Sequence, residues 1–183
     1  MIENPKFNQY WYSPSTVSVL LDEVESLGGR AAFLSTPSLF SAAVARSLPC
    51  DLFDFDPSLS ALAEGDSRFL LFDFNCPITD PAPLLLGGGY SVIVADPPFI
   101  SEPVWRLYGE TINRIRSPSR SRVILTTVRE NRGILAEIFG GEIFQHKFQP
   151  SIPSLVYQYE VFTDYRDSVH LSLLNQEIIS TEV

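Results

Sequence analysis

Apolar positions along the chain follow two different spacings. Residues 16–27 carry apolar side chains at helical spacing, and Gly28 and Gly29 follow them as a helix stop. Residues 91–95 instead form an uncharged run of small and β-branched residues, as expected of a strand that is buried on both faces of a parallel sheet. The pattern therefore predicts both helices and buried strands.

Along the rest of the chain, the same two spacings give an alternating series of elements. Strands are predicted at residues 31–34, 51–55, 69–72, 91–95, 123–127, 143–148 and 155–162. Helices are predicted at residues 16–27, 37–48, 103–115 and 131–139, while residues 56–66 are a helix or a loop. This alternation is typical of a wound α/β sheet, in which crossover helices join parallel strands.

The composition is that of a globular protein. With 183 residues, 45% hydrophobic and 19% charged, the chain fits one domain with a substantial core. No apolar run is long enough to cross a bilayer, and the N-terminus lacks the order of a signal peptide, so we expect a cytoplasmic protein. We expect one domain over residues 1–183, with an aromatic segment at 1–14 and a polar surface tail at 166–183.

The net charge of −9 bears on the choice of partner. The chain has 13 Lys and Arg against 22 Asp and Glu, whereas proteins that bind nucleic acid neutralise phosphates with basic side chains. The basic cluster of Arg114, Arg116, Arg120 and Arg122 is short, and a solvated loop is favoured there over a phosphate site. An acidic surface favours a basic protein partner. Neither the cysteines nor the histidines have metal-ligand spacing, and no metal site is expected.

The most informative local feature is Asp96-Pro97-Pro98-Phe99, directly after the strand predicted at 91–95. The two prolines end the strand and stiffen the turn. In open α/β sheets, ligands bind beyond the carboxyl ends of the strands, where this turn would lie. The residues alone leave two interpretations open: a binding turn, or a strand stopped by proline with a helix-capping Asp and a core Phe.

This tetrapeptide resembles the [DNS]-P-P-[YF] motif of S-adenosylmethionine-dependent amino-methyltransferases. Four further segments accompany it in order: Gln9-Tyr10-Trp11-Tyr12-Ser13, Ser35-Thr36-Pro37-Ser38, Phe53-Asp54-Phe55-Asp56 and Phe72-Asp73-Phe74-Asn75. Together, over residues 9–167, they resemble the N6-adenine-methyltransferase-like proteins that are regarded as lysine methyltransferases of translation elongation factor 1-alpha. The resemblance implies a seven-strand Rossmann-like methyltransferase sheet, flanked by helices on both faces, with its last strand antiparallel.

The resemblance also assigns the catalytic turn. Asp96 and the Pro97 carbonyl would accept hydrogen bonds from the target nitrogen, with Pro98 stiffening the turn. Phe99 would stack on a base or receive the cationic head or methylene stem of a lysine. An ionised Asp96 favours the protonated lysine, so its expected role is positioning, with water as the proton acceptor.

The cofactor implied is S-adenosylmethionine. Its carboxylate would meet the turn of Ser35, Thr36 and Pro37, which has no glycine, unlike the wider superfamily. Asp54 or Asp56 would accept the ribose hydroxyls. The adenine would lie near four residues after the third strand, Phe72, Asp73, Phe74 and Asn75. Taken singly, each of these residues is better explained as a turn or cap residue; their recurrence after three successive strands favours a site.

Tyr10, Trp11 and Tyr12 stand before the first predicted helix. They could staple the N-terminus to the core. In the family that the chain resembles this segment helps to close the site, which favours a role in substrate binding.

Three functions are compatible with these residues. The first is a protein-lysine N-methyltransferase acting on translation elongation factor 1-alpha. The second is an N6-adenine methyltransferase of DNA or RNA, because the same turn suits an exocyclic amine; the acidic charge makes nucleic acid the weaker candidate. The third is a non-catalytic partner subunit with a methyltransferase fold, which the glycine-free turn keeps open.

Overall fold

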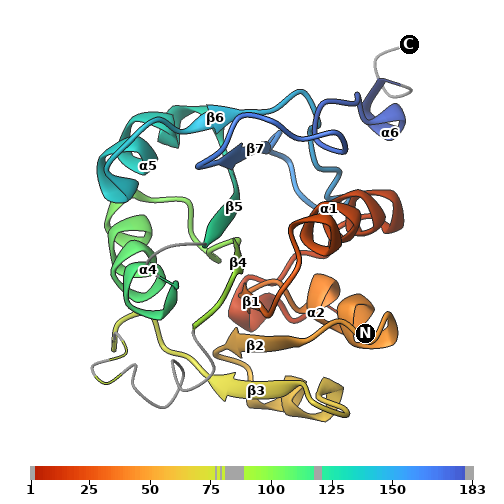
Figure 1. The fold of residues 1–183 in the computed structure, drawn as a ribbon, viewed down its shortest axis with the longest axis vertical. Helices are drawn as coiled ribbons and strands as arrows, with labels where there is room; N and C mark the ends of the chain where they lie inside the picture. Colours follow the sequence, from red (N-terminus) through yellow and green to blue (C-terminus); the bar gives the residue numbers. More distant parts are fainter. Residues whose placement is uncertain (1–2, 77, 79, 81–88, 118–120, 180–183) are drawn as a thin grey trace.

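The structure, a computed structural model, describes residues 3–76, 78, 80, 89–117 and 121–179. Its centre is a seven-stranded sheet with the order β3-β2-β1-β4-β5-β7-β6 (Figure 1). The strands are β1 (Ala31–Leu34), β2 (Cys50–Asp54), β3 (Arg68–Leu71), β4 (Val92–Ala95), β5 (Arg122–Thr127), β6 (Phe144–Gln145) and β7 (Glu160–Thr163). β7 runs antiparallel to both of its neighbours, β5 and β6, whereas β1 to β5 pair in parallel. The predicted fold class, including the antiparallel last strand, is confirmed.

Helices cover both faces of the sheet. α1 (Pro14–Leu27) and α2 (Pro37–Ala45) pack on one face, and α4 (Glu102–Ile115) and α5 (Arg132–Phe139) pack on the other (Figure 1). The shorter elements are η1 (Pro5–Phe7), η2 (Pro57–Leu62), η3 (Arg129–Asn131) and α6 (Gln176–Ile179). In the described residues, no helix is long and apolar enough to cross a membrane.

The core has two halves because β1, β4 and β5 are buried on both faces. Leu20 and Leu21 of α1 are fully buried in one half, and Trp105 and Ile112 of α4 in the other. α1 begins at Pro14, two residues before the predicted start, because the Ser13 side chain caps it by accepting a hydrogen bond from the Thr16 backbone N–H at 3.1 Å. Burial on both sheet faces explains why these strands have continuous apolar runs.

The last two strands are shorter than the sequence pattern predicts. β6 covers only Phe144–Gln145, and β7 starts at Glu160 rather than at 155. The connection between them contains Pro150 and Pro153, which cannot donate to a ladder. Val156 and Tyr157 are exposed there, so the apolar pattern does not mark a buried strand.

The polar segment after Tyr165 is more than a surface tail. Leu171 is fully buried, and its carbonyl accepts a hydrogen bond from the Phe148 N–H at 3.0 Å. The Asn175 side chain donates to the Gln149 carbonyl at 2.8 Å. The expected surface tail is therefore corrected for these residues, while residues 1–2 and 180–183 of the two end segments lie outside the described residues.

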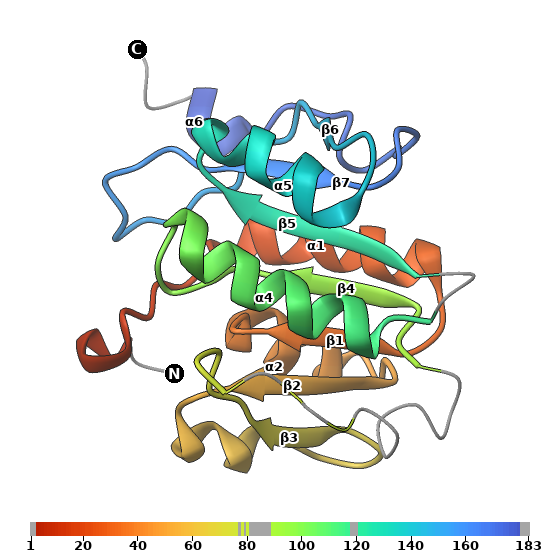
Figure 2. The same cartoon turned by 90° about the vertical axis from the view of Figure 1, so that its left-hand side faces the viewer.

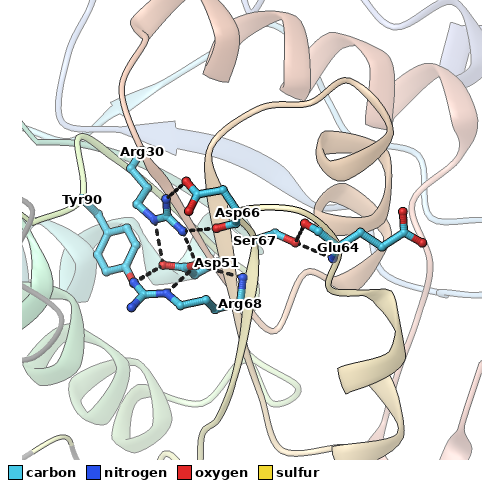
Figure 3. A network of polar contacts seen from close by, with 7 residues as sticks. All are labelled: Arg30, Asp51, Glu64, Asp66, Ser67, Arg68 and Tyr90. Atoms are coloured by element: carbon cyan, nitrogen blue, oxygen red, sulfur yellow. Dashed lines mark hydrogen bonds and ion pairs between the residues drawn. The ribbon is translucent and has the colours of Figure 1, made fainter.

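A buried carboxylate fixes the amino-terminal edge of the sheet (Figure 3). The Asp51 side chain is fully buried and accepts hydrogen bonds from Arg30 at 2.8 Å, Arg68 at 2.7 Å and the Tyr90 hydroxyl at 2.6 Å. Burial alone would raise the pKa of Asp51, but these donors lower it to about 2. The network joins the starts of four neighbouring strands, β1 to β4, and leaves the opposite edge free for a site.

Candidate active site

A cleft of about 720 Å³ lies at the carboxyl ends of the strands. The N-terminal segment with η1 lies on this side of the sheet, beyond the strand tips (Figure 2). Residues that line the cleft follow β1, β2, β3 and β4, because parallel strands end at the same edge. This is the position at which open α/β sheets bind ligands.

The Asp-Pro-Pro-Phe turn lies in the cleft and is held from both sides. All four of its residues, Asp96 to Phe99, line the cleft. The Asn8 side chain donates to the Pro98 carbonyl, and the Asn131 side chain donates to the Ile100 carbonyl at 2.7 Å. The Phe99 ring is 53% exposed, so it is open to a ligand. The structure thus brings the four predicted catalytic residues together.

Asp96 is poised between its charged and neutral forms. The Tyr12 hydroxyl donates to Asp96 Oδ2 at 2.6 Å. Burial raises the pKa of Asp96 to about 7, although the Tyr12 and Thr126 hydroxyls act in the opposite direction. Asp96 is therefore a carboxylate above about pH 7 and can then accept a hydrogen bond from an amine.

In the turn after β1, a serine adopts the backbone conformation for which glycine is usually needed. Ser35 has φ of 54°, the left-handed conformation that glycine adopts at low cost. Its hydroxyl is 2.6 Å from the Tyr108 hydroxyl, within hydrogen-bond distance. Ser35 and Pro37, both predicted to contact the cofactor, line the cleft. Thr36 does not: it precedes α2 without a side-chain cap bond, and its Oγ1 is buried without a partner among the described residues.

The structure separates the two acidic residues after β2. Asp54 lines the cleft, and burial raises its pKa to about 6. Asp56 does not line the cleft, because its carboxylate caps η2 through Ser58 and accepts a hydrogen bond from Gln9 at 3.2 Å. The structure therefore does not bring Asp56, predicted as an alternative ribose acceptor, to the cleft, and places it against the N-terminal segment instead.

The segment after β3 forms another wall. Asp73, Phe74 and Asn75 line the cleft, as predicted. Asp73 Oδ1 accepts from the backbone N–H of Asn75 at 2.9 Å and from its side chain at 3.0 Å. The Phe74 ring lies 5.9 Å from that of Tyr108. A half-buried carboxylate beside two aromatic rings suits a heterocyclic base.

The N-terminal aromatic residues divide between two roles. Tyr10 and Trp11 line the cleft, and the indole N–H of Trp11 is buried without a partner among the described residues. Tyr12 is only 6% exposed and lies beneath Asp96 instead of lining the cleft. Of the three predicted substrate-binding aromatic residues, the structure therefore brings Tyr10 and Trp11 to the cleft and not Tyr12.

Tyr108, Tyr159 and Asn8 are among the lining residues that sequence reasoning misses. For Tyr108 the pattern shows only the apolar face of a helix, where its ring also packs. Tyr159 precedes β7, in a stretch predicted as regular strand. Asn8 gives no sequence signal, because its role depends on a turn 90 residues away.

The donors and acceptors in the cleft fit a nucleoside cofactor with an amino-acid tail. Asp54 offers a carboxylate to ribose hydroxyls, and Phe74 offers a ring edge to a base. Trp11 Nε1 is an unsatisfied buried donor, which a polar ligand atom could satisfy. Among the described residues that line the cleft, Lys6 is the only basic one.

Comparisons with known proteins show the family to which the chain belongs. The sequence model of the family described as "Probable N6-adenine methyltransferase" matches residues 3–167. EEF1A lysine methyltransferase 1 of Bos taurus is 26% identical over 178 residues, covering 93% of this chain and 75% of its own length. A protein-lysine N-methyltransferase of Dictyostelium discoideum is 28% identical, covering 96% and 81%.

A solved structure shares the fold. The TehB-like S-adenosylmethionine-dependent methyltransferase of Corynebacterium glutamicum superposes with a TM-score of 0.55 at 12% identity, covering 81% of this chain and 85% of the other. At that identity the likeness concerns the fold alone. The family match extends over nearly the whole chain, including every strand of the sheet. The chain therefore belongs to the N6-adenine methyltransferase family.

Proposed function

We propose that this protein is a lysine N-methyltransferase that acts on translation elongation factor 1-alpha. Its enzyme class, an S-adenosylmethionine-dependent methyltransferase, follows from its family. The lysine and elongation-factor assignment is supported by the names of its relatives. The observation that carries the proposal is an acidic, aromatic cleft around Asp96, in which Lys6 is the only basic lining residue described. Such a substrate places the enzyme in the cytoplasm.

The residues of the cleft divide the binding work. S-adenosylmethionine, when bound, supplies a methyl group on a sulfonium. Asp54 would hold its ribose, and Phe74 with Asp73 and Asn75 would hold its adenine. Ser35, Pro37 and the start of α2 would face its carboxylate.

The acceptor amine is oriented by the catalytic turn. One N–H of a neutral lysine amine donates to Asp96 and the other to the Pro97 carbonyl, which leaves the lone pair directed away from both acceptors. The exposed Phe99 ring packs on the methylene stem or on the cationic head before deprotonation. Fixing the amine in this way converts a bimolecular attack into an oriented one.

Proton loss is a separate requirement. A lysine ammonium has a reference pKa of about 10.4 and cannot attack while protonated. Asp96, with its pKa raised to about 7 by burial, is a stronger base than an ordinary aspartate but still weaker than the amine. We therefore assign Asp96 to positioning and the proton to water.

The charge distribution disfavours nucleic acid. Arg122 begins β5 and Arg116 ends α4, so this basic cluster lies at the amino-terminal edge of the sheet, opposite the cleft. Arg114 is engaged with the Ile78 carbonyl at 2.6 Å, and Arg120 lies outside the described residues. Phosphates bound at that edge would not deliver a base to Asp96.

The proposal is tested by supplying labelled S-adenosylmethionine with unmethylated elongation factor 1-alpha, with DNA and with RNA. Label is expected in the protein alone, and mass spectrometry then locates the lysine. Asp96→Ala should abolish the signal, whereas Asp22→Ala, which changes an exposed carboxylate paired with Arg46, should not. Label only in nucleic acid would overturn the proposal in favour of an adenine enzyme. Absence of both labelling and cofactor binding would indicate a non-catalytic subunit.

A further inference from the structure

Tyr12 occupies a position that neither cofactor nor substrate binding explains. It directly precedes the cap of α1, and its side chain is buried in the core. Its hydroxyl lies 2.6 Å from Asp96 Oδ2 and 2.6 Å from Oγ1 of Thr126. Thr126 is fully buried on β5, the strand beside β4. Three segments distant in sequence therefore meet beneath Asp96.

We propose that Tyr12 is a positioning residue for methyl transfer: with Thr126 it holds one oxygen of the Asp96 carboxylate and leaves Oδ1 for the substrate amine. This inference rests on the proposed function, in which Asp96 receives that amine. It goes further by making the N-terminal segment part of the machinery that orients the catalytic carboxylate.

The hydrogen atoms of this group balance in both charge states of Asp96. When Asp96 is ionised, the Tyr12 hydroxyl donates to Oδ2 and Thr126 donates to the phenol oxygen. When Asp96 is protonated, its O–H donates to the phenol oxygen and the phenol donates to Thr126 Oγ1. Neither state requires the carboxyl group to rotate, so its orientation persists through titration.

The surroundings keep the Tyr12 phenol neutral and place no basic side chain of the described residues in competition with it at Asp96. Burial, followed by the nearby Asp96, raises the pKa of Tyr12 well above 10, so it remains a phenol. The other titratable groups that interact with Asp96 in the described residues are the phenols of Tyr108 and Tyr159. Within the same part of the chain, no basic side chain contributes to the pKa of Asp96. Tyr12 and Thr126 are thus the groups that offset the effect of burial on this carboxylate.

The decisive variant is Tyr12→Phe, which keeps the ring in the core and removes only the hydroxyl. We expect the acid limb of the kcat profile to move up by about one pH unit, because a lost charge-assisted hydrogen bond is of that size. At pH 9, where Asp96 is ionised in both proteins, kcat should still be about tenfold lower, with KM for the protein substrate within about twofold. Thr126→Val should shift the limb in the same direction.

The matched control is Tyr90→Phe. Tyr90 also donates a phenol hydrogen to a buried carboxylate, Asp51, at 2.6 Å, but at the opposite edge of the sheet. The Tyr90→Phe substitution should lower the melting temperature without moving the acid limb of the kcat profile. An equal shift in both variants would show a general effect of destabilisation and overturn the proposal.

A measurement without substrate separates this inference from the proposed function. The pKa of the Asp96 carboxyl is read by carbon-13 NMR of aspartate-labelled protein, with Asp96→Asn assigning the signal. Tyr12→Phe should raise this pKa and Tyr90→Phe should not. An unchanged pKa in Tyr12→Phe, or an unchanged kcat at pH 9, overturns the positioning role. A raised pKa in an enzyme that labels no protein refutes the proposed substrate while the contact between Tyr12 and Asp96 stands.

Discussion

The surroundings of Asp96 disfavour the charged form of its carboxyl group. Its unfolded pKa is near 3.8, and burial raises the folded value to about 7. Between these values the folded state binds the additional proton, so stability falls as pH rises through this window and is lowest above about 7. The catalytic carboxylate therefore destabilises the fold at the pH at which it is charged.

Replacing Asp96 with Asn should consequently stabilise the protein while abolishing methyl transfer. We expect a gain of about 1–2 kcal/mol at pH 8, discounted because the residue is only half-buried, and little gain at pH 4. Calorimetric melting at the two pH values checks the prediction. Asp22→Asn, at an exposed ion pair, is the control and should change neither quantity. A variant less stable than wild type at pH 8 would contradict it.

The two acidic residues after β2 make a second test at residue scale. Asp54 lines the cleft, whereas Asp56 caps η2. Asp54→Asn should weaken S-adenosylmethionine binding by about tenfold or more at pH 8, because a charged acceptor is lost. Burial raises the pKa of Asp54 to about 6, so its carboxylate takes up a proton below that pH. The affinity of the wild-type protein for S-adenosylmethionine should therefore decrease as the pH is lowered through 6.

Calorimetric titration of the cofactor against Asp54→Asn and Asp56→Asn makes the comparison. Asp56→Asn should bind the cofactor within about threefold of wild type, because Asp56 does not line the cleft and the amide oxygen can still accept a hydrogen bond from Ser58 or Gln9. Equal losses in both variants would show that the cleft is disturbed as a whole and would count against a ribose contact at Asp54.

At the scale of elements, the apolar patterns of the sequence predicted those strands and helices whose formation depends on neighbouring residues. The uncharged run before Asp96 indicated β4, because burial on both faces leaves no polar alternation. The same reasoning failed at residues 155–159, which form a connection rather than a paired strand, with Val156 and Tyr157 exposed. The positions of Tyr12 and Asn8 depend on contacts 84 and 90 residues away, so no local pattern could reveal them.

The N-terminal segment joins the two halves of the cleft. The Asn8 side chain donates to the Pro98 carbonyl on the substrate side. Gln9 donates to Asp56, and the Phe7 ring meets Phe55 edge-on at 5.9 Å, both on the cofactor side. Because few of these side chains are buried, the segment should affect binding more than stability.

Asn8→Ala should therefore raise the KM of the protein substrate severalfold while changing the free energy of unfolding by less than about 1 kcal/mol. Asn113→Ala is a matched control, since its side chain also donates to a backbone carbonyl, that of Ile138, away from the cleft. Steady-state kinetics and urea unfolding supply the two quantities. If Asn113→Ala altered KM equally, the Asn8 contact could not be responsible.

Across the whole molecule, the two edges of the sheet respond to pH in opposite directions. At the amino-terminal edge, donors around Asp51 lower its pKa to about 2 (Figure 3). At the carboxyl-terminal edge, burial raises the pKa of Asp54 to about 6 and that of Asp96 to about 7. The charge of Asp51 stabilises the amino-terminal edge, whereas the charges of Asp54 and Asp96 destabilise the carboxyl-terminal edge, where the cleft lies. Stability and function are thus separated along the strand direction.

This separation predicts the behaviour of Asp51→Asn. Asp51 contributes stability above its unfolded pKa, near 3.8, and loses it as pH falls toward 2. Removing the charge leaves Arg30 and Arg68 without their buried partner, so we expect a loss of about 3 kcal/mol at pH 7 by urea unfolding, and a smaller one at pH 3. Asp66→Asn, which alters an exposed partner of the same Arg30, should cost less than about 1 kcal/mol.

Cofactor affinity decides whether the two edges are independent. Under conditions in which Asp51→Asn remains folded, its dissociation constant for S-adenosylmethionine should stay within about twofold of wild type. The reason is that Asp51 and the cofactor cleft lie at opposite ends of the same strands. A tenfold loss would mean that the strands transmit strain from one edge to the other, and that the amino-terminal network shapes the cleft as well as stabilising the sheet.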